Sequence, residues 1–278
     1  MAGTLYVVAT PLGNLADLSP RAADVLRSAD VVAAEDTRRT RPLLAHLGAH
    51  PALLSYHAHS PEGQAAKLVA RLCAGETVAL VSDAGTPAIS DPGAELVAAA
   101  RAAGVPVVPI PGPSAVATVL SACGFGADRY LFLGFAPRKG AERDALLGRA
   151  AREPWPVVFF EAPNRLAALL DDLARVAGAD RPAAVGRELT KLHEEIRVGT
   201  LAELAAYYGN HEPRGECTVV LHGRPEDAAE AAPDAGAVEA FARARLAEGH
   251  SRSGVVRDVV ARFGLPRNEA YRLVTELA

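Results

Sequence analysis

The sequence predicts an α/β protein with two α/β domains and a small C-terminal helical extension. Apolar segments of strand length alternate with helical patterns along most of the 278 residues. These strands are apolar throughout, which is typical of a parallel sheet covered by helices on both faces. After a polar linker, apolar residues recur only at helical spacing. The length itself favours about two domains.

The first domain, with a parallel sheet, is predicted over residues 1–113. Its strands are expected over 5–9, 30–34, 52–55, 77–81 and 105–108. Its helices are expected over 20–29, around 43–47, over 64–72 and over 94–100. In open sheets of this kind, ligands bind beyond the carboxyl ends of the strands. The loops that follow the strands are therefore the first place to look for a site.

The second domain is predicted over residues 114–225 and is expected to contain a mixed sheet. Apolar strands are expected over 130–133, 157–160 and 183–185, with helices over 142–151 and 164–176. Residues 194–198 alternate between polar and apolar, and they could pair antiparallel with 217–221.

An acidic, alanine-rich and aperiodic segment, 226–236, is predicted to be a linker. In the remaining segment, 237–278, valines recur at helical spacing before the break Gly264-Leu265-Pro266, and the helical pattern then resumes. Two short helices around a glycine turn indicate a helix-turn-helix-like extension.

Composition narrows the class of protein. The net charge of −4 argues mildly against a nucleic-acid partner, although nearly all of the positive charge is arginine. No apolar run approaches the roughly 20 residues of a membrane span, so no membrane association is expected. The three cysteines fit reduced thiols of a cytoplasmic protein better than a disulfide framework, and no metal site is expected.

The loop after the fourth strand, VSDAGTPAISDPG, is unusually rich in special residues. Gly85 permits a positive φ or a close backbone approach. Asp91 is expected to cap the next helix, with Pro92 at its first position. Asp83 has no such structural explanation in the sequence, so it is a candidate for binding a ligand's amine, hydroxyl or positive centre. Alternatively, it is a turn aspartate that binds its own backbone.

Other strand ends also carry polar residues. Residues 10–15 read TPLGNL, which is not a dinucleotide-binding G-x-G-x-x-G pattern. Ser114 follows the fifth strand and is explained equally well as a helix cap or as a ligand contact. Two acids and three arginines meet within 35–41, which suggests a phosphate-tolerant mouth but also fits an ordinary solvated helix start.

Seven segments, taken together and in order, resemble the ribosomal RNA small subunit methyltransferase I family of the tetrapyrrole methylase superfamily. They read LYVVATPLGNLADLSPRA, AAEDTRRT, LVSDAGTPAISDPG, PIPGPSAV, FLGFAPRKG, FFEAPNRL and RELTKLHEEIRVGTL. The likeness runs from about residue 4 to 223, and the tail resembles the family's helix-turn-helix extension more loosely.

The resemblance implies two α/β domains that hold S-adenosylmethionine in the cleft between them. It implies methyl transfer to the 2′-oxygen of a cytidine ribose in 16S ribosomal RNA near the decoding centre, and a homodimer. Free 16S RNA and the 30S subunit are both open as substrates. The implied cofactor residues are Pro11, Leu12, Gly13, Asp83, Ala84, Gly85, Ile89, Ser114, Ala115 and Pro213.

A ribose hydroxyl is a weak nucleophile, so a general base would help the reaction. The candidates are Glu35, Asp36 and Lys191, in that order. Arg38, Arg39 and Arg138 are expected to hold RNA phosphates. Two alternatives stay open. One is a tetrapyrrole carbon methyltransferase on the same fold, which would not need the arginine-rich loops. The other is a non-catalytic RNA-binding protein.

Overall fold

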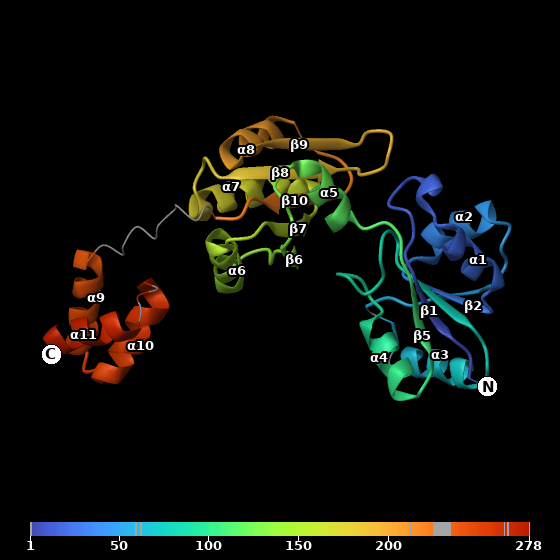
Figure 1. Cartoon of the computed structure of the whole chain (residues 1–278), viewed down its shortest axis with the longest axis horizontal. Helices are drawn as coiled ribbons and strands as arrows, with labels where there is room; N and C mark the ends of the chain where they lie inside the picture. The colour runs from blue at the N-terminus through green and yellow to red at the C-terminus, as the bar shows by residue number, and fades with distance from the viewer. Residues whose placement is uncertain are drawn as a thin grey trace. The chain divides into compact units, whose positions relative to one another are not determined.

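The computed structural model describes residues 2–58, 60–61, 63–211, 213–224, 235–263, 265 and 267–277. They form two compact units, 1–223 and 224–278. Among the described residues, the first unit contains two five-stranded sheets and the second contains helices only (Figure 1). This arrangement confirms the predicted fold class. The boundary between two domains at residue 113 stays a prediction, because both sheets belong to the same compact unit.

The first sheet is parallel throughout, with the order β3-β2-β4-β1-β5. Its strands are β1 (Leu5–Val8), β2 (Val31–Ala34), β3 (Ala52–Ser55), β4 (Val78–Val81) and β5 (Val107–Ile110). Its helices are α1 (Pro20–Ser28), α2 (Thr37–His46), α3 (Gln64–Cys73) and α4 (Ala94–Ala102), with a short 3-10 turn η1 (Leu15–Asp17) after β1. The predicted strands and helices of this part are confirmed, although some of their ends differ by a few residues.

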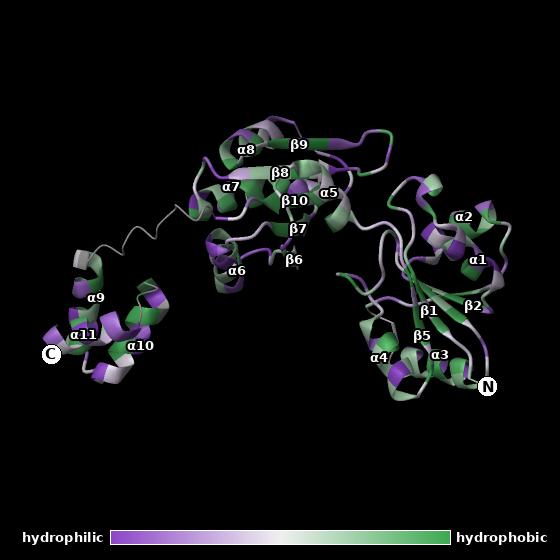
Figure 2. Ribbon diagram, in the orientation of Figure 1, coloured by the Kyte–Doolittle hydropathy of each residue, from purple (hydrophilic) through white to green (hydrophobic). Residues whose placement is uncertain are grey.

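Alternate residues of the central strands point to opposite faces of the sheet. Val78 and Leu80 pack with α3 and α4, whereas Ala79 and Val81 pack with α1 and α2. Figure 1 shows the two helix pairs on opposite sides of the sheet. Burial on both faces explains why the central strands β2 and β4 are apolar throughout. Figure 2 shows that β1 and β5 are also largely hydrophobic.

The second sheet is mixed and has the order β6-β7-β10-β8-β9. Its strands are β6 (Leu131–Phe135), β7 (Val157–Glu161), β8 (Pro182–Arg187), β9 (Glu195–Thr200) and β10 (Cys217–Leu221). The expected pairing of 194–198 with 217–221 is wrong, because β9 pairs with β8 and β10 lies between β7 and β8. Fully buried β10 suits the sheet centre, whereas partly exposed β9 suits the edge.

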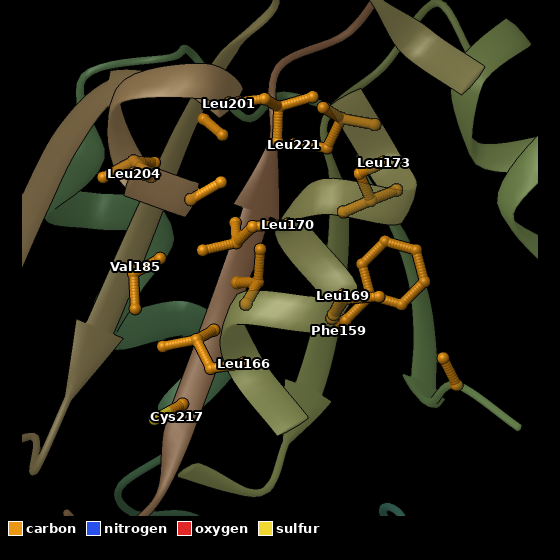
Figure 3. Packing of buried hydrophobic residues seen from close by; sticks show 14 of the residues in the cluster. Phe159, Leu166, Leu169, Leu170, Leu173, Val185, Leu201, Leu204, Cys217 and Leu221 are labelled. Atoms are coloured by element: carbon orange, nitrogen blue, oxygen red, sulfur yellow. The ribbon is translucent and has the colours of Figure 1, made fainter. Parts of the chain in front are cut away.

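Helices cover both faces of the second sheet. They are α5 (Ala115–Cys123), α6 (Ala141–Arg152), α7 (Leu166–Ala177), which follows the 3-10 turn η2 (Pro163–Arg165), and α8 (Leu201–Asn210). The helices α6, α7 and α8 pack on the face that carries Phe159 and Val185. Figure 3 shows this packing for α7 and α8. The opposite face packs against α5. Helix α8 was not predicted from the sequence.

The second unit has a hydrophobic core of its own. Its helices are α9 (Ala235–Ala247), α10 (Arg252–Phe263) and α11 (Arg267–Leu277). Val255 and Val259 of α10 are fully buried against Val238 of α9 and Val274 of α11. Residues 226–234 of the predicted linker lie outside the described residues, and 235–236 already belong to α9.

Candidate functional site

A cavity of about 430 Å³ lies within the first unit and is lined from both sheets. The first sheet contributes the loops that follow β1, β2, β4 and β5, all at the carboxyl ends of parallel strands. The second sheet contributes the ends of β6 and β7 and the start of β10. The strand-end loops that the sequence singled out therefore do converge on one cavity.

Most of the predicted site residues line this cavity. Those that do are Leu12, Glu35, Arg39, Asp83, Ala84, Gly85, Ile89, Ser114 and Ala115. Those that do not are Pro11, Gly13, Asp36, Arg38, Arg138, Lys191 and Pro213. Of the second group, Pro213 lines another cavity, and Arg138 is exposed beyond the end of β6.

The loops after β1 and β4 are joined beyond the sheet by an antiparallel bridge between Thr10 and Gly85. The Thr10 N–H donates to the Gly85 carbonyl at 2.8 Å, and the Gly85 N–H donates back at 3.0 Å. Gly85 has a φ of 78°, which is one of the two roles considered for this glycine. A Cβ at Gly85 would also approach Leu12 Cδ2 to 3.3 Å. This wall of the cavity is thus set by backbone pairing.

Asp83 and Glu35 link the loops after β4 and β2. The Asp36 N–H donates to Asp83 Oδ1 at 3.0 Å, and the Asp83 N–H donates to Glu35 Oε2 at 3.3 Å. Arg39 Nε lies 3.5 Å from Asp83 Oδ2. Burial raises the pKa of both carboxyls, although Arg39 and the backbone donors oppose the rise. Asp83 therefore has a structural partner that the sequence did not reveal.

Asp36 has a different environment from its neighbour. Its side chain accepts from the Arg38 N–H and caps α2. The same carboxylate pairs with the Arg38 guanidinium at 2.7 Å. The hydrogen bond from the Arg38 side chain lowers the pKa of Asp36 to about 2. A carboxylate that is fully ionised, paired and outside the cavity is a weak candidate for proton abstraction.

Asp91 does not cap α4, so that prediction is wrong. The N-cap is Gly93 with a φ of 134°, and the helix begins at Ala94. Asp91 instead lines the cavity. Burial, assisted by the charge of Glu35, raises the pKa of Asp91 to about 6. Backbone geometry that only glycine adopts easily, placed after Pro92, moved the helix start beyond the expected position.

Lys191 covers Gly13 from outside the cavity. A Cβ on Gly13 would lie 2.2 Å from Lys191 Cγ. Lys191 Nζ lies 2.8 Å from Glu188 and 3.3 Å from Glu216. Burial opposes protonation, but the hydrogen bond with Glu188 and the two carboxylate charges raise the pKa of Lys191. The lysine is therefore charged at neutral pH and holds the loops around the cavity together.

Glu161 lines the cavity but was not predicted from the sequence as a site residue. Its side chain is fully buried at the end of β7. Oε1 accepts from the Ala162 N–H at 2.8 Å, and Oε2 lies 3.0 Å from Arg165 Nη2 as an ion pair. Burial raises the pKa of Glu161 despite these donors. Its position in a charged strand-end segment, EAPNR, was the signal that could have found it.

Ser114 occupies the N-cap position of α5, yet its side chain makes no capping hydrogen bond. It borders the cavity. Two residues of the facing loop, Ala88 and Ser90, have positive φ angles of 66° and 61°. Non-glycine residues adopt such angles at a cost, and they often do so at ligand sites.

The lining of the cavity is acidic. Its carboxylates are Glu35, Asp83, Asp91, Glu161 and Glu216, and its one basic side chain among the described lining residues is Arg39. Such a cavity disfavours a polyphosphate and favours a ligand with positive charge. The aromatic rings of Phe135 and Phe160 add an apolar wall on the side of the second sheet.

The fold and the strand-end cavity define a class of protein. Residues 4–205 match the model of the tetrapyrrole (corrin/porphyrin) methylases, and the chain belongs to this family. The protein is a methyltransferase. It is 44% identical over 276 residues to ribosomal RNA small subunit methyltransferase I of Synechocystis sp., covering 99% of this chain and 98% of the relative. It is 45% identical to the protein of the same name from Micromonospora olivasterospora, covering 99% and 88%.

Solved structures share the fold at lower identity. A uroporphyrin-III C-methyltransferase from Thermus thermophilus, complexed with S-adenosylhomocysteine, has a TM-score of 0.59 and 24% identity, covering 79% of this chain and 97% of that one. A cobalt precorrin-4 methyltransferase has a TM-score of 0.61 and 20% identity, covering 78% and 94%. Among the described helices, none is long and apolar enough to cross a membrane.

Proposed function

We propose that the protein transfers a methyl group from S-adenosylmethionine to the 2′-oxygen of a cytidine ribose in 16S ribosomal RNA near the decoding centre. The observation that carries the proposal is the 44% identity, over nearly the full length, to ribosomal RNA small subunit methyltransferase I. It exceeds the 24% identity to the tetrapyrrole enzyme. We further propose that the enzyme is a cytoplasmic homodimer.

The acidic cavity fits this cofactor. S-adenosylmethionine supplies an electrophilic methyl group on a sulfonium centre, and it also carries an ammonium group. Asp83, which borders the cavity, would accept from the ammonium or a hydroxyl of the cofactor. The Ser114 hydroxyl has no capping bond and is available as a further contact. The apolar residues Leu12 and Ile89, which also border the cavity, would pack on the apolar parts of the cofactor.

Glu35 is the base that the geometry favours. It borders the cavity, it is partly buried, and its pKa is raised, so its proton affinity is closer to that needed near neutral pH. Asp36 is occupied by Arg38, and Lys191 is protonated by its pairing with Glu188 and Glu216. Orientation of the ribose and exclusion of water by the cavity walls are expected to contribute as well.

Arginine side chains outside or at the edge of the cavity would bind the RNA backbone. Arg38 is exposed beside the start of α2, and Arg138 is exposed after β6. Arg39 lies at the edge of the cavity between Asp83 and Glu216. In this proposal the three arginines supply positive charge around the acidic cavity. Phosphates would thus be held at the rim while the cationic cofactor occupies the interior.

The test is methyl transfer from labelled cofactor to 30S subunits, to naked 16S RNA and to a porphyrinoid, followed by mapping of the modified position. Label at a cytidine ribose supports the proposal, and the preferred RNA identifies the substrate. Label in the porphyrinoid instead would establish a tetrapyrrole methyltransferase. Cofactor binding without transfer to any of the three would favour the non-catalytic RNA-binding alternative.

Asp83→Ala tests the cofactor site. Loss of a charge-assisted contact should weaken cofactor binding by about 1.5–3 kcal/mol. Because Asp83 also accepts from the Asp36 N–H, a modest loss of thermal stability is expected too. Calorimetric titration of the folded variant measures the affinity. An affinity equal to that of the unchanged protein would remove Asp83 from the site.

A further inference from the structure

A second cavity, of about 450 Å³, lies in the first unit beside β8, β9 and α8. It differs from the first in its lining, which is aromatic and basic. The lining residues are Arg187, Glu188, His193, Glu195, Tyr207, Tyr208, His211, Pro213 and Arg214. Neither the family match nor the proposed methyl transfer assigns it a role.

The aromatic part is a fixed stack at the end of α8. Tyr207 and His211 have nearly parallel rings with centroids 4.4 Å apart. Arg197 Cζ lies 3.6 Å from the Tyr207 centroid, so the guanidinium and the imidazole must cover opposite faces of the tyrosine. His211 Nδ1 lies 3.0 Å from the Tyr207 carbonyl, which can only accept, so Nδ1 carries the proton. The exposed outer face of His211 is the end of the stack.

The carboxylates around this cavity are already engaged. Glu188 accepts from Lys191 Nζ at 2.8 Å. Glu195 accepts from the Tyr208 hydroxyl at 2.7 Å and pairs with Arg197. Arg214 is exposed, and no ion pair joins it to a carboxylate among the described residues. The charge that remains unpaired around this cavity is therefore positive.

The second cavity adjoins the first along one short segment of chain. Pro213 and Arg214 line the second cavity, whereas the next two residues, Gly215 and Glu216, line the first. Arg187 Nη1 also donates to the Arg214 carbonyl at 3.5 Å, which ties β8 to this segment. A polymeric substrate that presents one unit to the first cavity can therefore reach the second with a neighbouring unit.

We propose that the second cavity binds an unpaired nucleotide of the RNA substrate, with its base stacked on His211 and its phosphate held by Arg214. Stacking on an aromatic ring together with a guanidinium is the usual way in which proteins hold single-stranded RNA. Free phosphate would make no use of the stack. The inference rests on the proposed function, because it takes RNA as the substrate.

The test compares binding of 30S subunits by full-length variants at several salt concentrations. His211→Ala should weaken binding about tenfold, the size expected for loss of one stacked base. His211→Phe keeps a ring and should retain the affinity, which separates stacking from damage to the end of α8. Arg214→Ala should weaken binding and lower the salt dependence by about one phosphate contact. Cofactor affinity should be unchanged in all three variants.

Arg149→Ala on α6 is the matched control, because Arg149 is exposed and lines neither cavity. Ultraviolet cross-linking of the complex should join the peptide that contains 207–214 to a 16S nucleotide. Normal binding by His211→Ala and Arg214→Ala would overturn the proposal while leaving methyl transfer intact. Weaker binding with a cross-link to a ribosomal protein would overturn it in favour of a protein contact. If the unchanged protein neither binds nor methylates ribosomal RNA, the proposed function fails as well.

Discussion

Two consecutive carboxylates, Glu35 and Asp36, show how far one backbone step can change the chemistry of a side chain. Glu35 faces the cavity and is partly buried, whereas Asp36 turns to the end of α2 and to Arg38. Burial raises the pKa of Glu35, and the hydrogen bond from Arg38 lowers the pKa of Asp36 to about 2. Composition cannot distinguish the two residues, but the fold does.

Glu35→Gln is expected to reduce the methyl-transfer rate about 100-fold or more, the usual contribution of a general base. The base must be ionised, so the rate of the unchanged enzyme should fall as pH falls through the raised pKa of Glu35. This limb of the pH–rate profile should vanish in the variant.

Asp36→Asn is the control for this substitution. It should lower thermal stability slightly through loss of the ion pair with Arg38 while leaving the pH profile unchanged, because asparagine caps a helix about as well as aspartate does. Both variants are tested by measuring single-turnover rates from about pH 5 to 9. This range covers the pH values at which a general base of this kind usually works. A Glu35→Gln enzyme with the rate and profile of the unchanged protein would mean that the loop supplies no base.

Asp91 gives a prediction about stability. Its pKa of about 6 in the folded protein exceeds the ordinary value of 3.8, so the folded state holds the proton more tightly than the unfolded state. Below pH 3.8, Asp91 therefore makes its full contribution to the free energy of unfolding. This contribution is lost as pH rises to about 6. Asp91→Asn should be more stable than the unchanged protein at about pH 8, by about 1–2 kcal/mol after allowance for partial solvent exposure.

The two proteins should differ little at about pH 4, where the aspartate is largely protonated in the folded state. Urea unfolding without cofactor at the two pH values measures the difference, and Asp180→Asn at an exposed turn is the control. An equal effect of Asp91→Asn at both pH values would show that the aspartate is ionised as easily in the folded protein as in the unfolded chain.

At the scale of elements, the loop after β8 and the loop after β1 are fitted to each other through Lys191 and Gly13. Gly13→Ala should destabilise the protein by about 1 kcal/mol, because a Cβ there displaces the lysine from Glu188 and Glu216. In a Lys191→Ala background the same substitution should cost little. Thermal unfolding of the two single variants and the double variant gives the coupling.

Gly209→Ala on α8 is the matched glycine control, since a Cβ added there would have no neighbouring atom within 4 Å. It should be neutral or slightly stabilising. Equal losses for Gly13→Ala in both backgrounds would mean that the backbone of the β1 loop, and not the lysine, is the cause.

Elements with strong local patterns were predictable, and those that depend on distant partners were not. The strands of the first sheet could be located because burial on both faces leaves continuous apolar runs. The antiparallel partner of β9 could not, because pairing depends on which strands the connections bring together. The helix α8 did have a local signal, the capping box of Thr200 and Glu203.

Some residues of the candidate site could likewise be predicted from the sequence, whereas others could not. Residues at strand ends, such as Asp83 and Ser114, were found because parallel strands end at one edge of a sheet. Glu161 was missed because its importance comes from burial at the end of β7, which the sequence does not reveal. Asp91 was taken for a cap because the positive φ of Gly93 is not visible in the sequence.

At the scale of the whole molecule, the segment 237–278 carries a small excess of positive charge, with seven arginines and five acids. Its arginines are Arg243, Arg245, Arg252, Arg257, Arg262, Arg267 and Arg272. Arg243 and Arg245 are paired with acids, and Arg262 stacks on Phe241. The others are exposed, on α10 and α11. Only some of the seven arginines are therefore available to bind phosphate.

A chain truncated after Ala232 should bind the cofactor as the full chain does, because the first unit has its own cores. It should bind 30S subunits more weakly and with a smaller salt dependence, since fewer counterions are released. Filter binding at several salt concentrations tests this. Equal binding and methylation by both chains would make the tail a structural or dimer-supporting appendage.

The position of β10 in the sheet has a consequence for synthesis of the chain. β10 lies between β7 and β8 in the second sheet, yet it is the last strand of that sheet to be made. Until residues 217–221 emerge from the ribosome, β7 and β8 each present an unpaired apolar edge to the cell. Folding of the second sheet must wait for its final strand, and the nascent chain is most exposed to chaperones and to aggregation during that interval.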